Sequence, residues 1–143
     1  MDKYTEALIS ELEHRYNGAE KYSSMYLGGG SPILLGKNNL LKLFKAIQPK
    51  LINSAEKTIE LNASHIDTFD VDFFNRVSIG VQSTNTELLK IINREFDMDK
   101  LLGMLNTLKA TKIDVSMDFM FGIPEQNIQH LKNDLDFIIQ TRV

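Results

Sequence analysis

Cysteine is absent from this sequence of 143 residues, and several other features are missing with it. Without cysteine the chain forms no disulfide and offers no thiolate to zinc or to an iron–sulfur cluster. No apolar run approaches the ~18 residues that a membrane-spanning helix needs. The net charge is −3 and no window is strongly basic, which argues against a nucleic-acid or anionic membrane surface. We therefore expect no membrane span and no nucleic-acid partner.

The composition is that of an ordinary globular domain. Hydrophobic residues make up 43% of the sequence and charged residues 24%. The length suffices for one domain with a real core, so we predict a single domain over residues 1–143. The first residues, Met1 to Glu6, are charged rather than apolar, which does not suit a signal peptide. We therefore expect a cytoplasmic protein.

Hydrophobic periodicity predicts helices that alternate with strands. Helices are expected over residues 2–16, 40–51, 84–92, 97–108 and 127–140. Strands are expected to end at residue 27 and to cover residues 58–62, 76–82 and 114–121. The order predicts an α/β fold with parallel strands, either a small open sheet or part of a barrel. Four strands are few for a closed eight-strand barrel, which takes about 250 residues.

Polar residues before several of these helices are candidate caps. Asp2 is expected to cap the first helix, Asn38 or Asn39 the second, and Asp97 the helix that follows it. Thr84 and Glu87 have the spacing of a capping box. Residues 63–75 form a short acidic segment with room for about two helical turns.

Three consecutive glycines follow the first strand. Gly28, Gly29 and Gly30 come directly after the apolar run that ends at Leu27, and Ser31 and Pro32 follow them. Glycines leave the backbone free to adopt positive φ and let a ligand approach the N–H groups. A tight turn between strand and helix, with no ligand, is the alternative.

Each later strand has one apolar face and one polar or small face. Glu60, Gln82 and Asp118 fall on the polar faces, near the carboxyl ends of their strands. Sites form at these ends in parallel α/β folds. Polar groups on an inner sheet surface are costly unless they are paired or hydrated. We therefore predict a polar ligand across the strand ends; an exposed sheet face is the alternative.

Other chemistry finds little support. The three histidines lie far apart on different predicted elements, and the acidic residues near His65 match no defined metal site. No G-x-S-x-G motif occurs, and Ser78 and Ser83 have no histidine nearby. We therefore predict neither a metal site nor a catalytic residue in this chain.

Five motifs occur in order over nearly the whole chain. They are Tyr26-Leu27-Gly28-Gly29-Gly30-Ser31-Pro32, Glu60-Leu61-Asn62, Arg76-Val77-Ser78-Ile79-Gly80-Val81-Gln82-Ser83, Asn93-Arg94 and Asp118-Phe119-Met120-Phe121-Gly122-Ile123-Pro124. In this order and spacing they resemble the radical S-adenosylmethionine (SAM) proteins of the oxygen-independent coproporphyrinogen III oxidase type. This family includes the related haem chaperones.

The resemblance implies a parallel-strand, TIM-type partial barrel, of which this chain forms the strands after the first. It also implies a SAM site, with the glycines and Ser31 at the amino end of the methionyl group and the other residues at its carboxylate and ribose. An arginine suits a carboxylate, and acidic or amide side chains suit hydroxyl groups. The implied cofactor-binding residues are Gly28, Gly29, Gly30, Ser31, Glu60, Gln82, Arg94 and Asp118.

The sequence departs from the family pattern in ways that matter for chemistry. The CxxxCxxC motif that binds a 4Fe–4S cluster in the family is absent, so the cluster is expected only in the intact family protein. This chain alone therefore cannot carry out the family's radical reaction. The segment between Asn62 and Arg76 is shorter than usual, and Ala63 replaces a common proline. Thr84 and Thr86 stand in place of the usual Phe and Asp, and Phe96 in place of a frequent His.

Three hypotheses follow from the resemblance. The first is a fragment of a coproporphyrinogen III oxidase-like protein that binds SAM, with a porphyrinogen as substrate of the intact relative. The second is a haem-binding chaperone of the same family. The third is a decayed remnant with no activity. A partial barrel exposes strand edges, so we also predict self-association.

Overall fold

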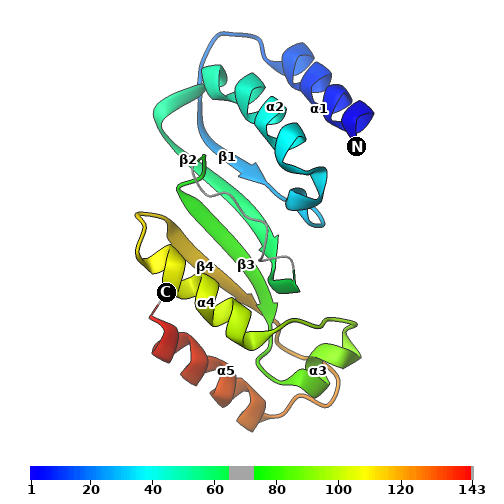
Figure 1. Cartoon of the computed structure of the whole chain (residues 1–143), viewed down its shortest axis with the longest axis vertical. Coiled ribbons are helices and arrows are strands. Elements are labelled where there is room, and N and C mark those ends of the chain that lie inside the picture. The colour runs from blue at the N-terminus through cyan, green and yellow to red at the C-terminus, as the bar shows by residue number, and fades with distance from the viewer. Residues whose placement is uncertain (65–72, 143) are drawn as a thin grey trace.

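The computed structural model describes residues 1–64 and 73–142 and contains a sheet of four parallel strands (Figure 1). The strands are β1 (Tyr22–Leu27), β2 (Leu51–Asn62), β3 (Arg76–Gln82) and β4 (Asp114–Phe119). Their order in the sheet is β1-β2-β3-β4, and each neighbouring pair is parallel. Each new strand is therefore added at the same edge, as in a barrel, and the predicted α/β class with parallel strands is confirmed.

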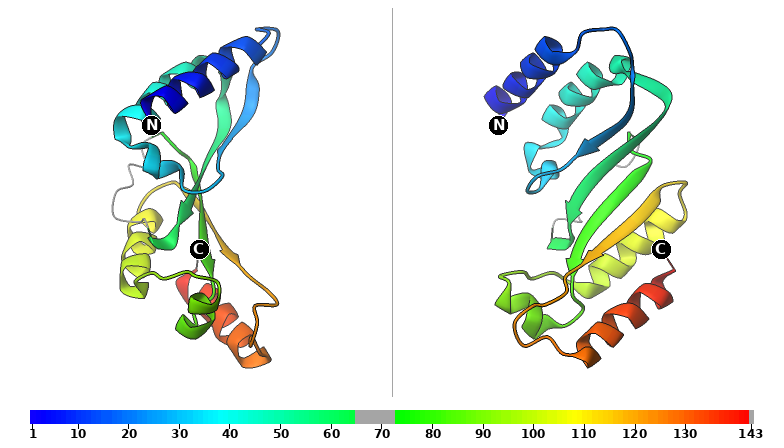
Figure 2. Two further views of the ribbon diagram at one scale, coloured as in Figure 1. Left: turned by 90° about the vertical axis from the view of Figure 1, so that its right-hand side faces the viewer. Right: turned by 180° about the vertical axis from the view of Figure 1, so that it is seen from behind.

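Five α-helices and two short 3₁₀ helices precede, connect or follow the strands within the described residues. They are α1 (Asp2–Arg15), η1 (Pro32–Leu35), α2 (Lys37–Ile47), η2 (Gln48–Lys50), α3 (Thr86–Ile91), α4 (Met98–Lys109) and α5 (Ile128–Thr141). Both α2 and α4 cover the same face of the sheet, and no described helix lies on the opposite face (Figures 1 and 2). None of the helices in the described part is long and apolar enough to cross a membrane.

The core lies between the sheet and its helices. Ile59, Val77 and Ile79 are fully buried on the helix-covered face, together with Leu101 and Leu105 of α4. These strand residues belong to the faces predicted to be apolar, because side chains alternate along a strand. The polar faces are therefore left on the side of the sheet without helices.

Element boundaries differ from the prediction in β2, β4 and α2, which ends at Ile47 rather than residue 51. Strand β2 begins at Leu51 rather than residue 58, because the chain leaves α2 through the 3₁₀ turn that contains Pro49. Strand β4 ends at Phe119 rather than residue 121. The predictions for the short helix within residues 63–75 and for the acidic segment near His65 concern residues that lie largely outside the described ranges.

Three of the predicted caps are wrong. Met1, not Asp2, precedes α1, and no side chain caps that helix. Gly36 precedes α2 without a side-chain cap, and Asn39 instead lies inside the helix, where its Nδ2 donates to the Leu35 carbonyl at 3.1 Å. Asn85, not Thr84, caps α3 and accepts a hydrogen bond from the Leu88 N–H at 3.0 Å. The cap of α4 is Asp97, as predicted, since its side chain accepts from the N–H groups of the first turn.

Candidate functional site

The candidate site is the edge of the sheet at which all four strands end. Because the strands are parallel, their carboxyl ends share this edge, and the register sets which residues are neighbours. Glu60 pairs with Ser78, and Gly80 pairs with Asn62 on one side and with Asp118 on the other. The glycines after β1 follow directly on Leu27, which pairs with Ile59. The turn after β1, Glu60 and Asp118 are therefore brought to one edge, as the sequence predicted.

The turn after β1 needs its glycines. Gly29 and Gly30 have φ values of 86° and 80°, a region that favours glycine. At Gly28 the reason is space: an added Cβ would lie 2.5 Å from Cε1 of Tyr26 and 2.7 Å from Oε2 of Glu60. The Gly29 N–H donates to the same Glu60 Oε2 at 2.9 Å. The missing side chain of Gly28 thus leaves room for a carboxylate and an aromatic ring beside the turn.

Asp118 is held by the neighbouring strand. The Ser78 hydroxyl donates to Oδ2 of Asp118 at 2.9 Å, reaching past Gly80, which has no side chain. Asp118 is exposed while Ser78 is buried. A carboxylate has about four acceptor positions, so one hydroxyl fixes the orientation of Asp118 and leaves most of its capacity for a ligand.

Gln82 ends β3 in an unusual backbone conformation. Its φ is 71°, and the Ser83 N–H donates to the Val81 carbonyl at 2.9 Å, which closes a three-residue γ-turn around Gln82. An added Cβ at Gly80 would lie 2.8 Å from Nε2 of Gln82. The Gln82 amide is therefore folded back over Gly80, on the polar face of the sheet.

Arg94 lies in the connection that follows α3, outside the strands. The Asn93 N–H donates to the Lys90 carbonyl and the Arg94 N–H to the Leu89 carbonyl, while Asn93 has a φ of 54°. These contacts form a Schellman motif, which ends α3 and explains why Asn precedes Arg here. Arg94 is exposed. Ser31, the remaining predicted residue, precedes η1 and is half-buried.

Two residues of this edge, Tyr26 and Ser78, were not predicted as site residues. Tyr26 lies two residues before Gly28, and this spacing places both on the same side of the chain. Ser78 has the same relation to Gly80. Neither partner could be predicted, since a contact across strands depends on the register and not on spacing along one strand.

A groove of about 570 Å³ lies elsewhere, between α4 and α5. Its walls carry apolar, amide and charged side chains, namely Thr84, Met98, Leu102, Leu105, Asn106, Lys109, Asn133, Asp136, Phe137, Gln140 and Thr141. None of the predicted site residues lines it. The groove is therefore separate from the edge at which the strands end.

The sequence profile of the radical SAM superfamily matches residues 2–138, so the chain belongs to the radical SAM superfamily. Among curated proteins it is 28% identical to the "Heme chaperone HemW" of Buchnera aphidicola subsp. Schizaphis graminum, over 96% of this chain and 39% of that protein. It is 29% identical to the "Oxygen-independent coproporphyrinogen III oxidase" of Escherichia coli K12, over 87% of this chain and 30% of that protein. The chain thus spans well under half the length of these relatives.

Solved structures agree with this assignment. The structure titled "Coproporphyrinogen III oxidase (HemN) from Escherichia coli is a Radical SAM enzyme" superposes with a TM-score of 0.85 at 27% identity. The superposition covers 98% of this chain and 35% of that one. Elp3 of Methanocaldococcus infernus, at 21% identity and a TM-score of 0.58, shares the fold. The predicted family and the TIM-type barrel fold are therefore confirmed.

The residues of this chain suit SAM but not an iron–sulfur cluster. The acceptors of Glu60 and Asp118 suit a ligand with an ammonium group and hydroxyls, as in SAM. The sequence has no cysteine, and residues 1–64 and 73–142 contain no group of three His, Cys, Asp or Glu that could hold a metal ion. This chain therefore does not fit an iron–sulfur cluster.

Proposed function

We propose that the edge at which the strands end binds SAM, and that this chain is the SAM-binding part of a coproporphyrinogen III oxidase-like protein. One observation carries the proposal: the Gly29 N–H donates to the Glu60 carboxylate at 2.9 Å, so the glycine turn after β1 meets an acidic side chain of β2 where the strands end. Backbone N–H groups and a carboxylate thus lie together at this edge, as a ligand with both anionic and cationic groups requires. Residues 1–143 would form one domain of the protein.

Each site residue has a proposed role that follows from its chemistry. Gly28 to Gly30, with Ser31, would receive the amino end of the methionyl group through backbone groups. Arg94 would bind the carboxylate, for which a guanidinium has matching geometry. Glu60, Gln82 and Asp118 would accept or donate hydrogen bonds to the ammonium and the ribose hydroxyls. The residues bind and orient SAM, and the cluster would have to be held outside this chain.

Two alternatives come from the same family. The similarity to the haem chaperone extends over 96% of this chain, which favours a haem-binding protein as the second candidate. Haem transfer to an apoprotein by the intact protein would support the chaperone, and decarboxylation of coproporphyrinogen would support the oxidase. The other alternative, a remnant without activity, requires that the chain bind no SAM. We propose a cytoplasmic location for either active protein.

Isothermal titration of the full chain with SAM tests the proposal. We expect a saturable isotherm that is lost in Arg94→Ala, since the carboxylate loses its cation. Arg15→Ala is the matched control, because Arg15 is an exposed arginine that pairs with Glu11 on α1, at 2.7 Å. Absence of binding by the unmodified chain would overturn the proposal and leave the remnant.

A further inference from the structure

Asp134 is a buried carboxylate that lies outside the candidate site. Only 4% of its surface is exposed, although it is an acidic residue of α5. Its Oδ1 accepts from the Thr84 N–H and the Thr84 hydroxyl, both at 2.6 Å. The Ser83 hydroxyl lies 3.3 Å from Oδ1 and 3.2 Å from Oδ2. One carboxylate of α5 thus collects every side-chain donor of two consecutive residues in the connection from β3 to α3.

Those two residues follow Gln82 directly. Gln82 is the centre of the γ-turn with positive φ, and the N–H that closes this turn belongs to Ser83. A non-glycine residue keeps such a conformation only where its surroundings impose it. At the centre of the turn, the Met120 N–H donates to the Gln82 carbonyl at 2.8 Å. The contacts with Met120 and Asp134 therefore hold the turn at its central residue and directly after it.

The contact between Asp134 and Ser83 also bears on the start of α3. The Ser83 hydroxyl accepts from the Asn85 N–H at 3.1 Å while it donates to Asp134. Asn85 in turn caps α3, the six-residue helix whose end presents Arg94. The segment fixed by Asp134 therefore lies between two of the predicted ligand-binding residues, Gln82 and Arg94.

We infer that Asp134 is a positioning residue of the SAM site, which fixes Ser83 and Thr84 so that the Gln82 amide is held over Gly80. The inference rests on the proposed function, but the position of Gln82 is measurable without a ligand. Asp134 supplies the acceptor that the Thr84 N–H and the buried Ser83 hydroxyl need, since a buried carboxylate is unfavourable unless it is hydrogen-bonded. Three donors satisfy this carboxylate, and all three belong to the connection.

The first test uses nuclear magnetic resonance on the ligand-free full chain. We compare the backbone and side-chain amide signals of Gln82 and Gly80 in Asp134→Asn and in Asp136→Asn. Asp136 is an exposed aspartate two residues along the same helix, so its substitution removes the same charge from α5. The signals are expected to shift in Asp134→Asn and to stay in place in Asp136→Asn. Unchanged Gln82 signals in Asp134→Asn overturn the inference.

A milder variant covers the case in which Asp134→Asn does not fold. Thr84→Val removes one of the donors at equal volume and leaves the carboxylate with the Thr84 N–H and Ser83, whereas Thr84→Ser keeps the hydroxyl. Gln82 signals that shift in Thr84→Val and return towards their original positions in Thr84→Ser support the inference. Equal spectra of Thr84→Val and the unmodified chain overturn it.

The second test measures SAM affinity in a double-mutant cycle. Asp134→Asn is expected to weaken binding by about tenfold, the effect of one buried hydrogen bond. In the Gln82→Ala background the same substitution is expected to have little further effect, because Asp134 acts through Gln82. An equal loss in both backgrounds overturns the inference. If the unmodified chain binds no SAM, the proposed function fails, and the resonance comparison alone decides the role of Asp134.

Discussion

The Gly29 N–H donates a hydrogen bond to Oε2 of Glu60 at 2.9 Å, so a residue of β2 holds the glycine turn that follows β1. The two residues are 31 positions apart in the sequence. Oε2 also lies where a side chain at Gly28 would stand. The glycines therefore do more than reverse the chain, because they bring a backbone donor to a carboxylate at the edge of the sheet. This carboxylate is the centre of the first prediction.

Glu60→Gln is expected to weaken SAM binding by about tenfold or more, since a hydrogen bond to a charged group is worth about 1.5–3 kcal/mol. The amide keeps an acceptor for Gly29 but loses the charge that an ammonium group requires. Stability is expected to change little, because the contact with Gly29 is exposed. Titration calorimetry and thermal unfolding measure the two effects.

Glu56→Gln is the control for that experiment. Glu56 lies on the same face of β2, four residues further from the edge, and pairs with Arg76 at 3.3 Å. Removing this charge is expected to leave SAM affinity unchanged. Equal affinities of Glu60→Gln and the unmodified chain would contradict the role of Glu60.

Gly28→Ala is expected to abolish SAM binding and to lower stability. Its Cβ would approach Cε1 of Tyr26 to 2.5 Å and Oε2 of Glu60 to 2.7 Å, so both side chains must move. Gly103→Ala is the matched control, because Gly103 lies inside α4 and an added Cβ meets nothing within 4 Å. Alanine there is expected to stabilise the chain by about 0.5–1 kcal/mol. Chemical denaturation of both variants measures the free energy of unfolding, which is expected to fall in Gly28→Ala and to rise in Gly103→Ala. A Gly28→Ala variant that is stable and binds SAM would refute the packing argument.

The sequence predicted the parallel strands and the face of each strand because both depend on local periodicity. Val77 and Ile79 alternate with Ser78 and Gly80, and this alternation alone assigns the two faces. The predicted residues Glu60 and Asp118 reach a common edge for the same reason, once the strands are parallel. Whether they bind SAM stays a prediction.

The contacts of Thr84 could not be predicted from local pattern. Thr84 and Glu87 match the spacing of a capping box, but Asn85 caps α3 and the Thr84 hydroxyl donates to Asp134, 50 residues further along the chain. Asn is the better N-cap residue of the two, and the packing of α5 against the connection gives the Thr84 hydroxyl another acceptor. The strand β2 was also predicted too short, since residues such as Asn53 and Ser54 in its first half are polar and exposed.

Glu13→Gln is expected to destabilise the chain by about 1–2 kcal/mol, although Glu13 itself is largely exposed. Its partner is Lys50, which is only 7% exposed and whose Nζ lies 2.8 Å from Oε1 of Glu13 and 4.8 Å from the centre of the Tyr16 ring. Losing the carboxylate leaves a buried ammonium with the ring alone. Lys50→Met removes that charge and keeps the volume, so its cost is expected to stay below about 1 kcal/mol.

Urea denaturation of the two variants measures this difference. Glu11→Gln is the control, because Glu11 pairs with Arg15 on the surface of α1 and such pairs contribute about 0–1 kcal/mol. A Glu13→Gln variant as stable as Glu11→Gln would show that the burial of Lys50 does not depend on its partner.

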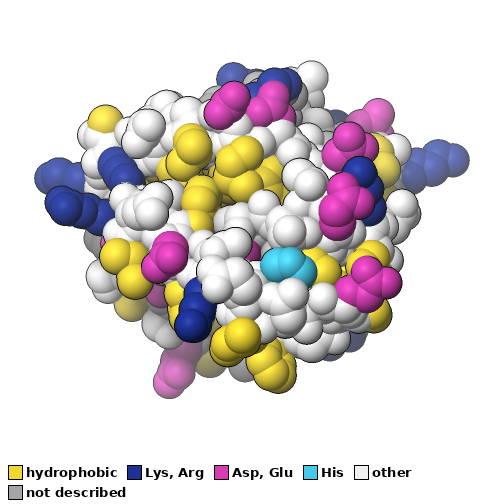
Figure 3. Space-filling model, turned by 90° about the horizontal axis from the view of Figure 1, so that it is seen from below, with side chains coloured by type: hydrophobic (Ala, Val, Ile, Leu, Met, Phe, Trp, Pro, Cys, Tyr) yellow, Lys and Arg dark blue, Asp and Glu magenta, His cyan; other side chains and the backbone are white. Residues whose placement is uncertain are grey.

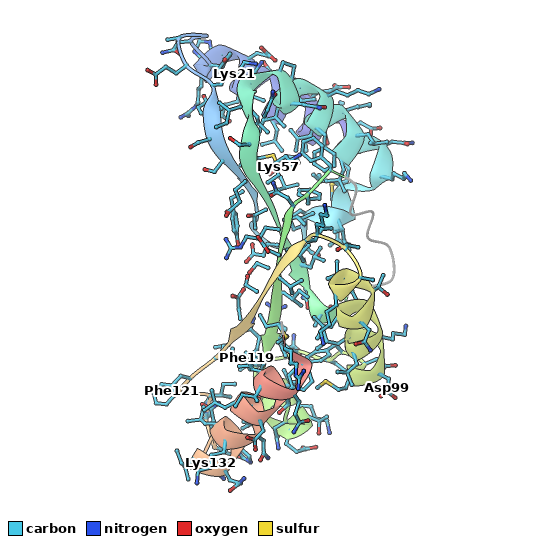
Figure 4. All side chains as sticks on the ribbon, turned by 90° about the vertical axis from the view of Figure 1, so that its left-hand side faces the viewer. Lys21, Lys57, Asp99, Phe119, Phe121 and Lys132 are labelled. Carbon is cyan, nitrogen blue, oxygen red and sulfur yellow. The ribbon has the colours of Figure 1, made fainter. Side chains whose placement is uncertain are left out.

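The chain is expected to self-associate through the side formed by β4 and α5. Among the described strands β4 has a neighbour on one side only, and Phe121 just beyond it is 85% exposed. Phe121 projects away from the ribbon on the side opposite Asp99 (Figure 4). On α5, Ile128, Leu135 and Ile139 lie at helical spacing and are exposed as well. The underside of the molecule, near α3 and the start of α5 in Figure 1, also carries apolar side chains between polar ones (Figure 3).

Ile139→Lys tests this surface, because Ile139 is 71% exposed and a lysine there opposes burial in an interface. Sedimentation velocity over a range of concentrations is expected to show an oligomer that weakens at least about tenfold in Ile139→Lys, as the loss of one buried isoleucine implies. Leu41→Lys, an exposed apolar position on α2, is the control and is expected to leave association unchanged. The unpaired edge of β4 and the apolar face of α5 favour association through the same side of the molecule. A chain that is monomeric at every concentration would therefore contradict the predicted self-association.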